Sequence, residues 1–211
     1  TDIGVAALVL DEEKIDLYGM AISGWKSIGI SRTVTKSEGS WIYTIDDLPA
    51  LEMYMKYLGT DSQSLETKYQ IMGDVGMHYP FLVEGMNDPV MRTPMTVDNE
   101  KNALQIDFEM PVGTKFKFSV PPDFDIVENV LEKATELKNE SKVDADALLI
   151  FSCAGRLNAL GPLAKVENDG LSEIWKTPMA GFFTYGEYGM TPDGRQEFCS
   201  TTCSWVALKE K

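Results

Sequence analysis

The sequence predicts an α+β fold, in which mostly antiparallel β-sheets carry helices packed on their outer faces. Strand-like runs dominate the first 46 residues, and a second series of short strand-like runs, separated by turn residues, occupies positions 80–120. Two other stretches, 47–59 and 125–140, repeat apolar residues at helical spacing. Together these observations predict helices layered on a largely antiparallel sheet or pair of sheets.

The first 46 residues predict strands over IGVAALVL and IDLYGMAISGW, joined by the charged turn DEEK. A hairpin is expected over TVTKSEGSWIYTID, with its turn at 37–40. The hydrophobic period then becomes helical. Asp47 is suited to cap a helix, Pro49 fits its first turn, and Gly59 can end it, so we expect a helix of about three turns.

Four short runs follow, which predict an antiparallel meander of strands: PFLVEG, VMRTPMTVD, NALQIDFEM and TKFKFSV. Turn residues separate them at 87–89, 99–102 and 111–113. The preceding segment, 60–76, is polar and predicts no regular structure.

The last third predicts two helices and three strands. In the segment 125–140 the apolar residues fall on one helical face, and Asp125 and Glu128 have the spacing of a capping box. The run ALLIFS is continuously apolar, which is typical of a strand covered on both faces, and we expect the Val127, Val130 and Leu131 face of the helix to pack on its sheet. A helix over 163–175 precedes two closing strands, MAGFFTYGEYG and EFCSTTCSWVALKE.

Composition excludes several classes of function. The 211 residues carry a formal net charge of −14 and a pI near 4.5, which argues against binding to nucleic acids or anionic membranes because such binding depends on clustered Lys and Arg. The chain has no apolar run near the roughly 20 residues of a membrane span and no signal-peptide core, so we expect a soluble protein. It begins at Thr1 in a strand-like run, which suggests a piece of a longer protein whose early strands pair with missing strands or with a second copy in a homodimer.

Cysteine usage points to a reducing compartment. Three cysteines, Cys153, Cys199 and Cys203, are an odd number in a chain too large to need disulfides, so we expect free thiols and a cytoplasmic location. Cys199 and Cys203 are expected on the same face of one strand. His78 is the only histidine, and with no CxxC pair the sequence supplies no metal site.

Two short stretches carry the candidate binding residues. In FSCAGR, Cys153 ends the buried strand, Gly155 suits a tight turn, and Arg156 offers a fork of donors to a carboxylate. In TYGEYG, strand alternation places Tyr185 and Glu187 on the same face. Arg156 and Glu187 either bind a ligand with both charges or form a structural ion pair with each other, and Cys153 either lines the pocket or simply fills the core.

Trp25 is a further candidate, because the glycine before it is compatible with a position at the edge of a pocket. A position in the core is the simpler explanation. His78 could supply an axial ligand to haem iron, although a lone histidine beside Tyr79 and Pro80 is more often a surface or hydrogen-bonded residue. No cofactor is therefore assigned.

Several ordered segments resemble the FIST domain family, the sensory modules of bacterial signal-transduction proteins and of a eukaryotic F-box protein. The segments are LLIFSCAGR followed by LG, then GFFTYGEYG and TTCSWVALKEK, and earlier GW, VTKSEG, IDDLPALEMYMKYLG, VMRTP and PVGTKFKF. The resemblance implies that residues 1–46 are the end of the family's N-terminal half and that 47–211 are its C-terminal, ligand-binding half. It differs at EFCSTTC, where a His-Asn pair commonly follows the phenylalanine but Cys199 and Ser200 stand here.

The resemblance implies a sensory input domain that binds small ligands such as amino acids, and haem for nitric oxide sensing in some members, with no known reaction. We therefore expect a pocket lined by Cys153, Gly155, Arg156, Tyr185 and Glu187, and a signalling output domain or protein as partner. The alternatives are an enzyme with Cys153 as nucleophile on an amide or thioester, and a protein-interaction platform without a small ligand.

Overall fold

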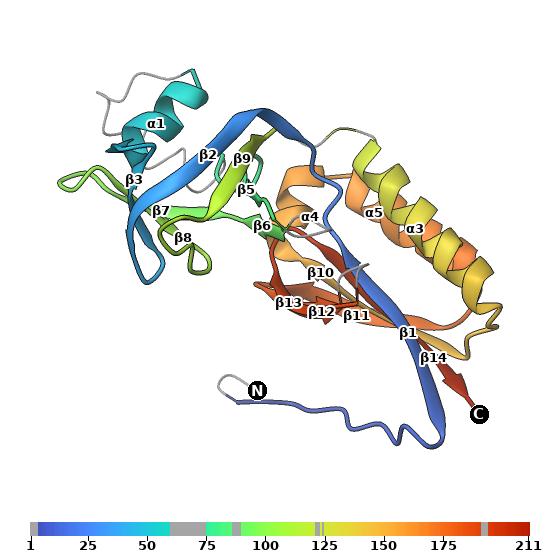
Figure 1. The fold of residues 1–211 in the computed structure, drawn as a ribbon. Coiled ribbons are helices and arrows are strands. Elements are labelled where there is room, and N and C mark those ends of the chain that lie inside the picture. The colour runs from blue at the N-terminus through green and yellow to red at the C-terminus, as the bar shows by residue number, and fades with distance from the viewer. Residues whose placement is uncertain (1–3, 60–74, 86–89, 121–122, 124, 191–193) are drawn as a thin grey trace.

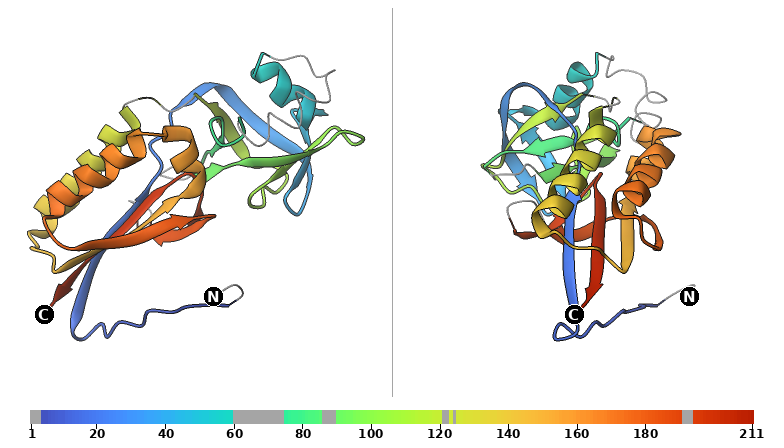
Figure 2. Two further views of the ribbon diagram at one scale, coloured as in Figure 1. Left: turned by 180° about the vertical axis from the view of Figure 1, so that it is seen from behind. Right: turned by 90° about the vertical axis from the view of Figure 1, so that its right-hand side faces the viewer.

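The computed structural model describes residues 4–59, 75–85, 90–120, 123, 125–190 and 194–211. These residues form sheets of predominantly antiparallel strands with helices on their outer faces, which confirms the predicted α+β class (Figure 1). One four-stranded sheet and one eight-stranded sheet lie at opposite ends of the molecule, and a two-stranded hairpin lies beside the first (Figures 1 and 2).

The four-stranded sheet has the order β1-β14-β10-β11. Its strands are β1 (Ile15–Ile22), β14 (Cys203–Glu210), β10 (Ala147–Cys153) and β11 (Met179–Thr184). β10 contains the run ALLIFS and lies between β14, to which it is antiparallel, and β11, to which it is parallel. The predicted internal position of ALLIFS is thus confirmed.

Helices α3 (Asp125–Ser141) and α5 (Leu163–Trp175) lie side by side on one face of this sheet (Figure 1). Val130 and Leu131 of α3 pack into a core with Trp205 of β14, as the amphipathic pattern predicts. Val127 lies one turn earlier and joins a second cluster with Trp25, so it extends the core past the end of the sheet. The predicted capping box does not form: Asp123 accepts the Asp125 N–H (3.1 Å).

The eight-stranded sheet contains the predicted hairpin, but the predicted meander is wrong: TKFKFSV pairs with PFLVEG and with the first hairpin strand, and NALQIDFEM pairs with the second hairpin strand, so these two consecutive runs are not neighbours. Its strands are β2 (Ser27–Glu38), β3 (Trp41–Ile45), β4 (Leu48–Pro49), β5 (Phe81–Val83), β6 (Val90–Arg92), β7 (Pro94–Asp98), β8 (Ala103–Ile106) and β9 (Lys115–Ser119). α1 (Ala50–Tyr57) buries Tyr54 against Phe81 and Phe118 of this sheet. The predicted turns at 99–102 and 111–113 separate its strands, whereas the one predicted at 87–89 lies outside the described residues.

Helix α1 is shorter than the sequence predicts. It begins after Pro49, and Asp47 is not its cap but a left-handed residue (φ 64°) in the turn between β3 and β4. Leu48 and Pro49 are paired with Ile45 and Thr44 of β3 as the short strand β4. These two residues therefore have a strand conformation, and the helix begins only after them.

Two of the closing strands that the sequence predicts as continuous are each broken in the structure. MAGFFTYGEYG divides into β11 and β12 (Glu187–Met190), and EFCSTTCSWVALKE divides into β13 (Gln196–Cys199) and β14. β12 and β13 form the separate hairpin. The expectation that Cys199 and Cys203 share one strand face is therefore wrong, since the two lie in different sheets.

The apolar segment 4–10 does not form the predicted strand. Val5 (96%), Leu8 (68%) and Val9 (88%) are exposed, and no described strand pairs with the edge of β1 that lies opposite β14 (Figure 1). A strand needs a neighbour to receive its backbone hydrogen bonds, and apolar alternation alone does not provide one. β1 is consequently an edge strand of the four-stranded sheet.

A short helix, α4 (Ala154–Leu160), starts where the sequence predicts a tight turn. Gly155 lies inside it, and a Cβ there would approach the Met77 sulfur to 3.3 Å, so the glycine allows close packing rather than a turn. α5 follows with the predicted bounds. Within the described parts of the chain, none of the helices is long and apolar enough to cross a membrane.

Candidate functional site

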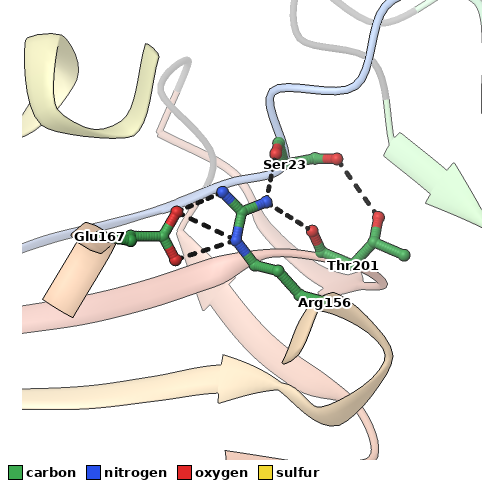
Figure 3. Close-up of polar contacts among 4 residues, drawn as sticks. All are labelled: Ser23, Arg156, Glu167 and Thr201. Carbon is green, nitrogen blue, oxygen red and sulfur yellow. Dashed lines mark hydrogen bonds and ion pairs between the residues drawn. The ribbon is translucent and has the colours of Figure 1, made fainter. Parts of the chain in front are cut away.

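Arg156 is a buried anchor of the fold. Its side chain is fully buried, its Nε donates to both oxygens of Glu167 (3.0 and 3.1 Å), and its Nη2 donates to Glu167 Oε2 (Figure 3). Nη1 donates to the carbonyls of Ser23 (2.5 Å) and Thr201 (3.2 Å). The guanidinium thus ties α4 to α5, to the end of β1 and to the loop before β14.

This arrangement corrects the expected partner of Arg156. Its carboxylate partner is Glu167 of α5, and not Glu187, because the two helices α4 and α5 fold back on each other and bring residues 11 apart in sequence together. A bidentate pair inside the protein uses the geometry that the sequence suggested for a ligand carboxylate.

Trp25 supports the same anchor. Its ring lies 5.5 Å from the Arg156 guanidinium, its Nε1 donates to the His78 carbonyl (3.1 Å), and it is 5% exposed. Trp25 is therefore a core residue beside the anchor. Among the residues that the structure describes, no group of three or more His, Cys, Asp and Glu side chains is arranged so that it could hold a metal ion.

Glu187 is a second buried acid, at the start of β12. It is 3% exposed and accepts hydrogen bonds from the hydroxyls of Thr184 and Thr202, the latter at 3.0 Å. Burial raises the pKa of Glu187 to about 7, because desolvation disfavours the carboxylate more than the two threonines favour it. A carboxyl that titrates near neutrality inside a fold is a candidate for a functional group.

Cys153 lies next to Glu187, as the sequence predicts. Burial and then the Glu187 charge raise the pKa of the Cys153 thiol, and burial raises those of Cys199 and Cys203 as well. All three thiols are free and buried. These shifts favour the thiol form, whereas a nucleophile needs the thiolate.

We expect Cys153 to resist alkylation. With iodoacetamide at pH 7, all three cysteines should react far more slowly in the folded protein than in urea, as peptide mass spectrometry would measure. A Cys153 that reacts as fast in the folded protein as in the unfolded chain would favour the enzyme alternative.

Tyr185 does not join Glu187. The strand break falls between β11 and β12, so the alternation that predicts a common face ends there, and Tyr185 is 95% exposed while Glu187 is buried. The predicted pair is therefore wrong in its geometry.

A cavity of about 890 Å³ lies between the four-stranded sheet and the hairpin; we call it the hairpin cavity. Its wall includes residues of β1, β10, β14, β12 and β13, together with Phe108 and Leu137: Leu17, Tyr18, Gly19, Met20, Phe108, Leu137, Phe151, Tyr188, Gly189, Gln196, Glu197, Phe198, Ser204, Trp205 and Val206. Gly189 lets the hairpin approach the sheet, since a Cβ there would come within 2.9 Å of the Ala21 Cβ.

A chain of hydroxyls links this cavity to Glu187. Ser204 is a wall residue whose hydroxyl lies 3.2 Å from the Thr202 hydroxyl, and Thr202 donates to Glu187 Oε2. Phe151, another wall residue, precedes Cys153 by two positions on β10. Glu187 and Cys153 thus lie directly behind the cavity wall, and not in it.

Sequence reasoning missed the residues that form this cavity. Tyr188 follows Glu187 directly in the candidate stretch TYGEYG, but an unbroken strand alternation favours Tyr185 as the neighbour of Glu187 on the same face. Thr202 and Ser204 belong to the run STTCS, whose cluster of hydroxyls within a predicted closing strand is the sequence signal that points to them.

Comparison with protein families gives two matches that adjoin one another. The family model described as the FIST C domain matches residues 50–190, and the one described as the FIST N domain matches residues 1–48. No curated protein and no solved structure matches the chain.

Proposed function

The chain belongs to the FIST family of signal-transduction sensory domains, and we propose that it receives its input as a small ligand bound in the hairpin cavity. The observation that carries the proposal is the coincidence of a large, mostly apolar cavity with a buried carboxyl, Glu187, joined to its wall through hydroxyls. Ligand sites are typically apolar cavities with a few polar groups, and carboxyls with shifted pKa gather at such sites.

The proposed site shares some residues with the pocket predicted from the sequence and differs from it in others. Glu187 and Cys153 remain behind its wall, while Tyr188 replaces Tyr185 as the aromatic contact. Arg156 has no part in it, because the guanidinium already binds four protein oxygens. Gly155 and Trp25 contribute to packing around that anchor.

The test is a thermal-shift screen of the protein against amino acids, small carboxylates and uncharged aromatic compounds. A ligand at a hundred times its Kd adds about 2.7 kcal/mol to stability, which should raise the Tm by about 5–10 °C in a chain of this size. A haem titration, followed in the visible spectrum, tests haem binding in parallel. If no compound changes the Tm, the protein-interaction alternative is favoured.

The hairpin offers a matched pair of variants. Tyr188→Ala should weaken the binding of any hit about tenfold, since it removes an aromatic wall, whereas Tyr185→Ala should leave binding unchanged. Both side chains are exposed (80% and 95%), so neither change should alter folding much. Weaker binding in Tyr185→Ala alone would return the site to the position that the sequence predicts.

As partners we propose a signalling output domain or protein, and a second copy paired through the outer edge of β1. The support for the second copy is an eight-residue edge strand that contains one charged residue, Asp16, and no proline, and so lacks the usual protection against edge pairing. Light scattering over a concentration series should show a dimer, and a monomer at all concentrations would contradict this pairing.

A further inference from the structure

We propose that the hairpin cavity takes an uncharged, largely apolar ligand with one hydroxyl or amine, which donates to Ser204, and that Glu187 controls through Thr202 whether Ser204 accepts or donates a hydrogen bond. This inference rests on the proposed function and adds to it the class of ligand and a link between binding and a proton. It differs from the zwitterionic ligand expected from the sequence.

The lining of the cavity argues for an apolar, uncharged ligand. Leu17, Phe108, Phe151, Tyr188 and Val206 supply aliphatic and aromatic walls. A free charge in the ligand would be costly here, because apolar walls cannot replace its hydration.

The charged group in the wall is already paired. The Glu197 carboxylate accepts from Arg92 Nη2 (3.3 Å), and the same guanidinium donates to the Phe198 carbonyl (3.0 Å) and lies 4.9 Å from the Phe108 ring. Arg92 is held behind the aromatic pair Phe108 and Phe198, which stack at 5.0 Å. Neither charge is left for a ligand to neutralise.

The positions of the hydroxyl protons determine whether Ser204 can donate a hydrogen bond to a ligand or accept one from it. Thr202 has one hydroxyl proton, which it donates to Glu187 Oε2 when that carboxyl is ionised. In the contact between Thr202 and Ser204, Ser204 must then be the donor. Its proton is thereby used, and its oxygen remains an acceptor for a ligand O–H or N–H in the cavity that Ser204 lines.

Protonation of Glu187 allows the reverse direction. A carboxyl O–H can donate to Thr202, Thr202 can then donate to Ser204, and Ser204 gains a free proton for a ligand acceptor. The proton stays on Glu187 at mildly acid pH because burial raises its pKa to about 7.

The groups that face Glu187 are neutral near pH 7. They are the hydroxyls of Thr184 and Thr202, the Thr202 backbone N–H, and the thiol of Cys153 on β10. Cys199 lies opposite Glu187 in the β12–β13 ladder, and its thiol pKa is raised to about 11. Protonation at Glu187 is therefore the event that changes the chain of hydroxyls between pH 5.5 and 8.5.

Two probes of almost the same shape test the inference: 2-naphthol, which can donate a hydrogen bond, and 2-methoxynaphthalene, which can only accept one. Their Kd values are measured by fluorescence at pH 5.5 and 8.5. At pH 8.5 the protein should bind 2-naphthol about tenfold more tightly than the ether, the worth of one hydrogen bond, and at pH 5.5 the ratio should approach one.

Variants separate the steps. Ser204→Ala should bring the ratio near one at both pH values, and Thr202→Val should make the ratio independent of pH, with circular dichroism to confirm the fold. A wild-type ratio that is the same at both pH values overturns the inference while leaving the cavity site intact. If neither probe binds the wild type, or if Tyr188→Ala binds both as tightly as the wild type does, the proposed function itself fails.

Discussion

Replacing Arg156 with alanine is expected to lower the free energy of unfolding by roughly 3–5 kcal/mol. The change leaves the Glu167 carboxylate, 1% exposed, without its partner, and it also removes the donors to the carbonyls of Ser23 and Thr201. Breaking a buried pair is costly because the remaining charge stays buried. Urea denaturation followed by circular dichroism measures the loss.

Lys165→Ala is the matched control, because it also breaks an ion pair of α5, with Asp169, but an exposed one worth under about 1 kcal/mol. The double variant Arg156→Met with Glu167→Leu should recover much of the stability, since apolar residues of similar volume often replace a buried pair without loss. An Arg156→Ala protein as stable as Lys165→Ala would contradict the anchor and would free Arg156 for a ligand.

The stability of the unliganded protein is expected to depend on Glu187 between pH 4.5 and 7. Its pKa rises on folding from 4.5 to about 7, so the folded state binds the proton more tightly than the unfolded state does. The stabilisation is complete below pH 4.5 and is lost as pH rises through 7. Over that window the wild type should lose on the order of 3 kcal/mol relative to Glu187→Gln, which keeps a neutral side chain.

Glu84→Gln serves as the control with the opposite sign. Hydrogen bonding to Ser31 lowers the pKa of Glu84, so the wild type should there gain stability with rising pH relative to its glutamine variant. Denaturant unfolding at several pH values measures both differences. Wild-type and Glu187→Gln curves that run parallel from pH 4.5 to 7 would show that Glu187 is not a buried, proton-binding group.

The sequence predicts those helices and strands whose own pattern of apolar residues shows which faces are buried. α3 and α5 have apolar faces at helical spacing, and β10 is apolar along its whole length, so each can be placed from local pattern alone. The short helix α4 and the start of α1 escape prediction, because the backbone N–H groups at their starts bond to distant segments: Cys153 donates to the Thr202 carbonyl (2.9 Å) and Leu51 to the Asn102 carbonyl (3.0 Å).

The candidate site is less predictable, because it forms where strands break. The apolar alternation of MAGFFTYGEYG continues across residues 185 and 186, although the chain there leaves one sheet and enters the hairpin. The sequence nevertheless predicts that Cys153 and Glu187 lie close together. The partner of Arg156 and the role of Ser204 could not be predicted, since both depend on how separate elements pack.

Mapping the binding of 2-naphthol by NMR tests most directly the claim that the hairpin cavity receives the ligand. In a titration of the isotope-labelled protein we expect the largest shift changes at the amides of Phe151, Tyr188, Ser204 and Val206, all of which lie in the cavity wall. Changes centred on Tyr185 and Phe183, or spread weakly over the whole surface, would contradict a ligand site in this cavity.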